Sequence, residues 1–223
     1  MNVVDNFDLL AKALFPEDGK CPEGEFYFVQ ILVRGKDGNH VNGNNKNRLV
    51  RYYVVRSAEK LQEIKQEVHQ LCLMHNARAY IHPTPRNDKE VAAIMLEDAV
   101  HEYTVGNYHC FRKLYSTACG KSFMKDKKLY IVDLDPEQLE HPALGAGLGI
   151  NPVETVRYLL HICRGSGGPN FPKVVVDVPT KHGVHLVTVP FDIGQFTKYF
   201  EEKGVKVPDI HKNNPTLLFA MKD

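Results

Sequence analysis

The sequence predicts an α+β protein with two lobes, and three observations lead to this fold class. Stretches rich in aromatic and β-branched residues alternate with stretches whose apolar residues recur at helical spacing. A polar and basic segment over residues 120–128 separates a first set of elements from a second. In the second set the predicted order is βαββαβ. We therefore expect a lead-in over residues 1–24, an N-terminal αβ lobe over 25–126 and a second lobe over 127–223.

In the first lobe, two strand patterns precede the helices. Residues 26–33 and 48–55 are rich in aromatic and β-branched residues, and the segment 35–47 between them is rich in Gly, Asn and Lys, which indicates a hairpin with a long loop. Ser57 can cap a helix that ends near Asn76. The other predicted elements are a small helix in the lead-in (7–15), a short strand (77–82), a helix capped by Asn87 or Asp88, and a helix over 108–118.

In the second lobe, helix caps and strand patterns define the order βαββαβ. Asn151 and Asp192 are each placed to cap a helix, and Pro152 suits the first helical position. A ferredoxin-like or RRM-like (RNA-recognition-motif-like) sheet is the compact solution, because each βαβ crossover is right-handed and the first strand becomes central. The predicted elements are strand 129–134, helix 152–163, strands 173–178 and 183–190, helix 193–202 and strand 215–221.

Composition narrows the class of protein further. Lys and Arg number 28 against 27 Asp and Glu, so there is no overall basic field to drive nonspecific nucleic-acid binding. No stretch approaches the roughly 18 continuous apolar residues of a membrane span, and the first residues do not resemble a secretory signal. We therefore expect a cytoplasmic protein without a membrane partner. The five cysteines form no Cys-x-x-Cys pair, which favours reduced thiols and no zinc site.

The strongest chemical signal is the segment Tyr-Ile-Val-Asp-Leu-Asp that ends at Asp135. Residues two apart in a strand share a face, so Asp133 and Asp135 would lie about 7 Å apart on one side of the sheet. Two carboxylates that close need a cation to offset their repulsion. Alternatively, Asp133 faces solvent and Asp135 begins a turn with Pro136.

Two further segments carry candidate site residues. Gly183 permits a tight turn before His185 enters an apolar strand, although a single histidine on a strand is more often a structural residue. Asp209 lies in a polar segment after Val207 and could supply a third oxygen ligand for Mg²⁺ or Mn²⁺. The alternative is that this segment is only a connecting loop.

Together these segments resemble the motifs of the archaeo-eukaryotic primase superfamily, the primase-polymerases. The segment 130–135 looks like its hydrophobic-DxD motif, 180–186 resembles its second motif with a small residue and glycine before a strand histidine, and 207–209 is similar to its third. The match covers residues 127–221. The resemblance implies an RRM-like catalytic lobe in which Asp133, Asp135 and Asp209 bind Mg²⁺ or Mn²⁺ and His185 contacts the phosphates of a nucleotide.

The resemblance also implies a reaction and partners. A 3′-hydroxyl of DNA or RNA would attack the α-phosphate of a nucleoside triphosphate, which makes the chain an enzyme, with a replication helicase as a partner and a phage or mobile element as a source. The basic groups suited to bind the nucleotide are Lys181, Lys212, Arg78 and Arg86, for each of which ordinary solvated surface charge is the alternative. Thr180 is a further nucleotide-binding candidate. The chain departs from the family in that the first lobe carries no motif of it, and a zinc-binding cysteine set and a helicase region are absent from the sequence.

Two other functions fit the same residues. A metal-dependent nuclease or other phosphoesterase would use the same acids. A noncatalytic RRM-like nucleic-acid-binding module would instead stack bases on aromatic residues of its central strands, whereas Tyr130 is the one aromatic residue in the first of these strands.

Overall fold

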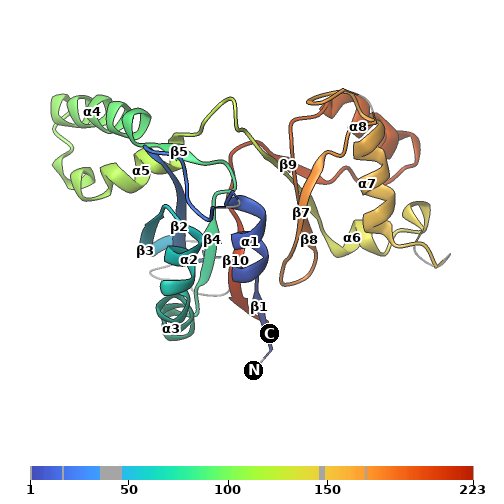
Figure 1. Cartoon of the computed structure of the whole chain (residues 1–223), viewed down its shortest axis with the longest axis horizontal. Helices are drawn as coiled ribbons and strands as arrows, with labels where there is room; N and C mark the ends of the chain where they lie inside the picture. The colour runs from blue at the N-terminus through green and yellow to red at the C-terminus, as the bar shows by residue number, and fades with distance from the viewer. Residues whose placement is uncertain (1, 17, 36–46, 146–148, 169, 223) are drawn as a thin grey trace. The chain divides into compact units, whose positions relative to one another are not determined.

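The computed structural model describes residues 2–16, 18–35, 47–145, 149–168 and 170–222, and the chain divides into two compact units. The first unit comprises Met1–Lys128 with Leu217–Asp223, and the second comprises Leu129–Thr216. Each unit combines helices with its own antiparallel sheet (Figure 1), so the predicted α+β class is confirmed. Most of the predicted loop over 35–47 lies outside the described residues.

The first unit contains a six-stranded sheet in the order β1-β10-β4-β2-β3, with β5 paired to β2. Strand β2, which pairs with β3, β4 and β5, is buried on both faces: Phe26 and Phe28 pack against α4 and α5, while Tyr27, Val29 and Ile31 lie on the other face. The strands are β1 (Val3–Asp5), β2 (Glu25–Val33), β3 (Arg48–Val55), β4 (Arg78–Ile81), β5 (Arg86–Asn87) and β10 (Thr216–Met221). The helices are α1 (Phe7–Leu14), α2 (Ala58–Glu63), α3 (Lys65–His75), α4 (Asp88–Thr104), the 3₁₀ helix η2 (Tyr108–Lys113) and α5 (Leu114–Lys121).

Side-chain caps start these helices where the sequence predicts them. The Ser57 hydroxyl accepts a hydrogen bond from the Lys60 N–H, and the Asn87 side chain accepts from the N–H groups of Lys89 and Glu90. The single helix predicted after Ser57 is two helices, α2 and α3, which meet at Ile64. No helix in the described ranges has the length and apolar character needed to cross a membrane.

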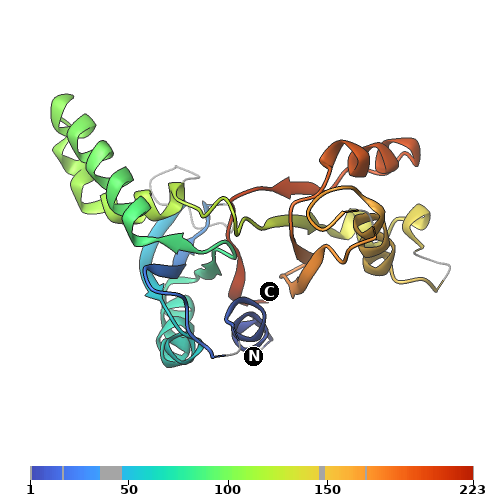
Figure 2. The same cartoon turned by 45° about the horizontal axis from the view of Figure 1, so that its top comes forward.

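The prediction of a loose lead-in over residues 1–24 is wrong. Strand β1 pairs with β10, so Val4 lies opposite Ala220 and the two ends of the chain are neighbours in one sheet (Figures 1 and 2). Phe7 and Leu10 of α1 are fully buried. The first residues are therefore part of the core of the first unit.

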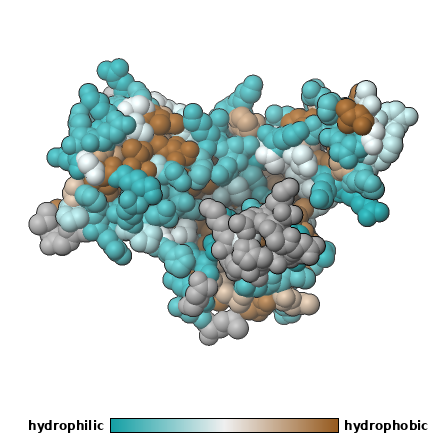
Figure 3. All heavy atoms as spheres, turned by 180° about the vertical axis from the view of Figure 1, so that it is seen from behind, coloured by the Kyte–Doolittle hydropathy of each residue, from teal (hydrophilic) through white to brown (hydrophobic). Residues whose placement is uncertain are grey.

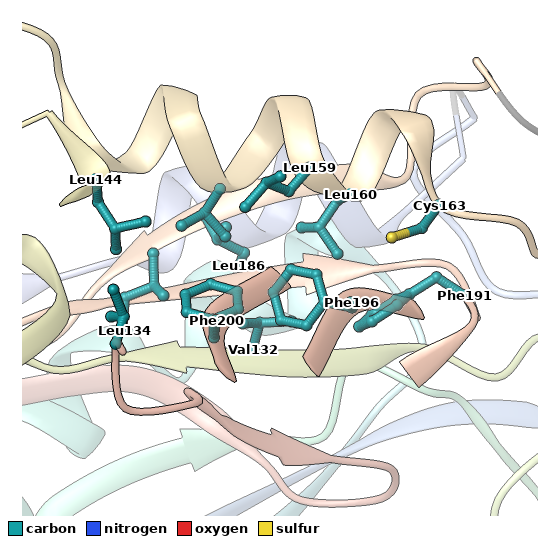
Figure 4. Close-up of a cluster of buried hydrophobic side chains, with 12 residues drawn as sticks. Val132, Leu134, Leu144, Leu159, Leu160, Cys163, Leu186, Phe191, Phe196 and Phe200 are labelled. Carbon is teal, nitrogen blue, oxygen red and sulfur yellow. The ribbon is translucent and has the colours of Figure 1, made fainter. Parts of the chain in front are cut away.

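The second unit contains a four-stranded sheet in the order β7-β8-β6-β9, in which neighbouring strands are antiparallel. Helices α7 and α8 pack on one face, where Leu159, Leu160, Phe196 and Phe200 contact Val132 and other strand residues (Figure 4). The strands are β6 (Tyr130–Leu134), β7 (Val174–Pro179), β8 (Val184–Thr188) and β9 (Asp209–His211). The helices are α6 (Pro136–Leu139), the 3₁₀ helix η3 (Pro142–Leu144), α7 (Pro152–Ile162) and α8 (Ile193–Glu202).

The predicted order βαββαβ has a different last strand in the structure. The prediction assigned residues 215–221 to this sheet, but that strand is β10 and lies between β1 and β4 in the first unit. The fourth strand of the second sheet is β9, which pairs with β6. Residues 217–223 therefore belong to the first unit, although the predicted second lobe included them.

Candidate functional site

Three ionisable residues form one row across the second sheet. On the central strand β6, Asp133 lies directly opposite His185 of β8 and directly opposite Asp209 of β9. Directly opposed residues of antiparallel strands point to the same face, with Cβ atoms about 5 Å apart. The structure therefore brings together three of the predicted site residues, His185, Asp133 and Asp209, in this order on neighbouring strands.

The row lies on the sheet face opposite to α7 and α8. Val132 and Leu134, on either side of Asp133 in sequence, are fully buried in the core that these helices cover. Because side chains alternate along a strand, Asp133 points to the other face. The side chain of Asp133 is 28% exposed to solvent and that of His185 is 14% exposed, while Asp209 is exposed. The row is thus reachable at its Asp209 end.

His185 is held by contacts at both ring nitrogens. Its Nε2 lies 3.4 Å from Asp133 Oδ1, and its Nδ1 lies 2.9 Å from the hydroxyl oxygen of Thr216, which is fully buried. Burial alone would raise the pKa of the Asp133 carboxyl, but the hydrogen bond from His185 and the charges of His185 and His211 outweigh it and lower the pKa. Asp133 therefore stays an anion, the form in which a carboxylate binds a metal.

Two members of this environment were missed in the sequence. His211 follows Asp209 by two residues on β9 and pairs with Ile131, so it shares the face of the row. Thr216 is the first residue of β10, and its hydroxyl orients His185. Neither has a sequence signal: His211 is a single histidine in a polar segment, and Thr216 reads as an ordinary strand residue.

Asp135 lies outside the row. It follows the end of β6, it is exposed, and it is the residue that precedes the first turn of α6, with Pro136 at the first helical position. Its backbone N–H donates to Gln138 Oε1 at 3.0 Å. This is the position that the alternative interpretation, a turn at Asp135-Pro136, had predicted.

The segment before His185 is built around a close approach of two strands. A Cβ on Gly183 would overlap the carbonyl oxygen of Leu134, so only glycine fits there. The Thr180 hydroxyl accepts a hydrogen bond from the Gly183 N–H at 2.9 Å, which closes the turn. Lys181 lies in this turn, near the carboxyl end of β6, and the exposed Lys212 follows β9 toward the amino end of β6.

The two predicted arginines lie in the first unit. Arg78 is half-buried in β4. Arg86 is fully buried, and its guanidinium donates to the carbonyl oxygens of Cys119 and Thr84 at 2.8 and 2.7 Å, with His82 Nδ1 at 2.7 Å. This position argues against the phosphate contact predicted for Arg86, since its donors are directed to its own unit.

The donor set of the row suits a hard cation. Carboxylate oxygens are the ligands that Mg²⁺ and Mn²⁺ prefer, and Mg²⁺ is commonly held by one or two carboxylates, with water and substrate phosphates completing its shell. Among the described residues, no three His, Cys, Asp or Glu side chains lie together as a metal-binding group. A metal here would therefore rest on Asp133 and Asp209, with the remaining ligands from outside the protein.

Two surface cavities of the second unit lie away from this row. One, of about 360 Å³, lies between α7 and the start of β7, with Arg157, Tyr158 and Lys173 among its lining residues. The other, of about 250 Å³, lies between α7 and α8. The α7 and α8 residues that line them belong to the helix side of the sheet, whereas the row is on the other face.

The chain was compared with known protein families, curated proteins and solved structures. No family model matches the chain, and neither a curated protein nor a solved structure matches it.

Proposed function

We propose that the second unit is the catalytic lobe of a metal-dependent nucleotidyltransferase of the primase-polymerase type, which adds nucleotides to a 3′-hydroxyl of a nucleic acid. The observation that carries this proposal is the placement of two carboxylates, Asp133 and Asp209, directly opposite each other on adjacent strands. Like charges in directly opposed positions destabilise a sheet, and a divalent cation removes that cost.

The topology of the unit supports an RRM-like lobe. The strand order β7-β8-β6-β9, with α7 between β6 and β7 and α8 between β8 and β9, is the arrangement of a βαββαβ ferredoxin-like fold. The carboxylates then lie on the two neighbouring strands β6 and β9, and His185 lies on the other neighbour of β6. The sheet register thus brings together three of the four residues that the sequence motifs mark, and it leaves out Asp135.

Asp133 and Asp209 would hold Mg²⁺ or Mn²⁺. When bound, the ion would lower the pKa of the attacking hydroxyl and offset the charge of the leaving pyrophosphate. Asp133 is suited to this role because its lowered pKa keeps it ionised. Asp135 follows the end of the strand, so as a metal ligand it would reach the ion from outside the row.

His185 would contact the phosphates of the incoming nucleoside triphosphate. Its position between Asp133 and Thr216 fixes the ring, so that the imidazole is oriented before a ligand arrives. Lys181, near the carboxyl end of β6, and Lys212, toward its amino end, would add positive charge toward the triphosphate or the template strand. Thr180 would act indirectly, because its hydroxyl closes the turn that leads into the strand of His185.

The test combines metal titration with nucleotide incorporation. We expect Mn²⁺ to bind the wild type in calorimetry and to bind neither Asp133→Asn nor Asp209→Asn, with primer extension lowered at least about 100-fold in both variants. Glu202→Gln is the matched control, because Glu202 is an exposed acid of α8, on the helix side of the sheet. It should retain both metal binding and extension.

Three outcomes would overturn the proposal in different ways. Equal and negligible Mn²⁺ binding in the wild type and the variants would remove the metal site. DNA cleavage without extension would assign a nuclease that uses the same acids. Nucleic-acid binding that survives both substitutions, without either activity, would assign a noncatalytic RRM-like module.

A further inference from the structure

Helix α4 of the first unit has two apolar faces, and the fold of the chain covers one of them. On the covered face, Val91, Ile94 and Met95 pack against the aromatic residues of β2 and against α5. On the other face, Leu96, Val100 and Tyr103 are 63%, 67% and 68% exposed. A helix that is apolar on both sides is normally buried on both sides.

The exposed face has a regular pattern. Ala92, Leu96, Ala99 and Tyr103 follow one another at spacings of four, three and four residues, which is the spacing of the core positions in a coiled coil. Ala93 and Val100 flank this stripe and are exposed. We call these six residues the α4 stripe. Hydrophobic surface is visible on this part of the molecule at the upper right of Figure 3.

We infer that the α4 stripe is a dimer interface in which α4 packs antiparallel against α4 of a second copy of this chain. The inference is independent of the proposed function. It rests on the fit of the stripe to itself, first in the sizes of its side chains and then in its charges.

The sizes alternate along the stripe, with small Ala92 and Ala99 and large Leu96 and Tyr103. In an antiparallel pair related by a twofold axis, Ala92 faces Tyr103 of the other copy, and Leu96 faces Ala99. Each large side chain then meets a small one, which allows close packing. A parallel pair would place Tyr103 against Tyr103 and leave the alanines apart.

The charges favour the same orientation. Lys89 lies one turn before the stripe and Glu102 lies near its end, so antiparallel copies bring Lys89 of each near Glu102 of the other. Lys89 also comes close to the C-terminal end of the other helix, where a positive charge is favourable. Parallel copies would instead align like charges.

Exposed apolar residues beyond the stripe extend this surface. Tyr108 packs edge-on against Tyr103, with ring centroids 5.8 Å apart, and Val105, Tyr108 and Phe111 are 59%, 61% and 42% exposed. The stripe itself spans about 17 Å of helix. A contact of this size gives a dimer that dissociates on dilution.

Sedimentation equilibrium of the full chain, from about 1 μM to about 1 mM, tests the association. We expect a monomer–dimer equilibrium in the wild type and a monomer at all concentrations for Leu96→Glu. Met74→Glu is the matched control, since Met74 is a 77% exposed apolar residue of α3 in the same unit, and it should dimerise like the wild type. A monomeric wild type, or a Leu96→Glu variant that still dimerises, would overturn the inference.

Cysteine crosslinking tests the orientation. In a Cys21→Ser/Cys110→Ser background, a mixture of Ala92→Cys and Tyr103→Cys chains should form a disulfide-linked heterodimer under oxidising conditions. Either chain alone should not, because its two cysteines would lie about 16 Å apart along the antiparallel helices. Crosslinking of Tyr103→Cys alone would show a parallel pair and overturn the proposed packing.

Discussion

The two units each place a histidine beside a charged residue, but they use the pair differently. In the first unit, His82 contacts Arg86, which is fully buried and donates to the carbonyl oxygens of Thr84 and Cys119. In the second unit, His185 contacts Asp133. On the other side of β6, Asp133 lies directly opposite a second acidic residue, Asp209 of β9. The Arg86 guanidinium is enclosed by its own unit, whereas Asp133 belongs to a row whose Asp209 end is exposed.

This difference contrasts a structural use of charge with the functional use that we propose. A buried guanidinium whose donors reach backbone carbonyls stabilises the segments that carry those carbonyls. Two carboxylates in directly opposed positions cost stability, and folds retain such costs mainly at functional sites. The comparison predicts that substitutions in the first network change stability, whereas substitutions in the row change ligand binding.

The largest expected effect on stability is that of Arg86→Met. Burial lowers the pKa of Arg86 to about 10, which shows how far this charge is removed from water. Methionine would remove the donors that Arg86 supplies to the carbonyl oxygens of Thr84 and Cys119 inside the core. We expect the free energy of unfolding to fall by about 3 kcal/mol, measured by urea denaturation.

The control for this prediction is Arg112→Met, because Arg112 is exposed on η2 and its loss should change stability by less than about 0.5 kcal/mol. If Arg86→Met left stability unchanged but weakened triphosphate binding, Arg86 would be a phosphate contact, and the contrast between the two networks would fail.

A smaller loss is expected for Gly183→Ala, which lies next to the row. A Cβ at this position overlaps the Leu134 carbonyl oxygen, so β6 and β8 must move apart. We expect a loss of about 2 kcal/mol in unfolding free energy and weaker Mn²⁺ binding, since Asp133 and His185 lie on these two strands. Gly120→Ala in α5, where a Cβ meets open space, should instead stabilise the protein by about 0.5 kcal/mol.

The sequence predicted the second unit well up to its last strand. The caps at Asn151 and Asp192 and the apolar strands produce strong local patterns, and the structure has those helices and strands. The prediction of the last strand was wrong because β9 has only three residues, Asp-Ile-His, with a single apolar side chain between two polar ones. The continuous apolar run of β10 is a much stronger strand signal, but its partners β1 and β4 are distant in sequence.

The arrangement of the candidate site was partly predictable for a related reason. Asp133, His185 and Asp209 were found because short motifs mark them, and the register of the sheet brings them into one row. Thr216 and His211 were missed because their roles depend on pairing across strands, which a single residue type does not indicate. The burial of Arg86 was missed because arginine is ordinarily a surface residue.

The substitution Thr216→Val tests the contribution of a single hydrogen bond to the position of His185. Valine keeps the shape of threonine but removes the hydroxyl that lies 2.9 Å from His185 Nδ1. We expect a loss of about 1 kcal/mol in unfolding free energy and a changed tautomer of His185, observed by ¹⁵N NMR of the imidazole.

Thr188→Val is the matched control for Thr216→Val. Thr188 is also fully buried in the second unit, but its hydroxyl oxygen has no hydrogen-bond partner among the residues that the structure describes. Replacing it should leave stability unchanged or raise it slightly, and the His185 signals should not move. If both variants lost the same stability with His185 unperturbed, Thr216 would be a packing residue only.

The smallest expected effect is a difference in acid sensitivity between the units. In the first unit, His69 stacks on Phe219 with ring centroids 4.0 Å apart, and burial lowers its pKa below the ordinary value of 6.5, although Asp5 partly opposes this shift and Lys65 adds to it. As the pH falls below 6.5, the unfolded chain takes up this proton before the folded one, so stability is lost. Asp133 has a lowered pKa as well, but its ordinary value is 3.8, so its contribution is lost only in stronger acid.

Hydrogen exchange measured by mass spectrometry at about pH 7 and about pH 5 separates the two cases, after correction for the intrinsic exchange rate. Peptides of α3 and β10 should lose protection at the lower pH in the wild type, and they should lose less in His69→Phe, which keeps an aromatic ring without a titrating group. Peptides of β6 should behave alike in both proteins. Equal losses from α3 in the wild type and in His69→Phe would show that another group sets the acid sensitivity of the first unit.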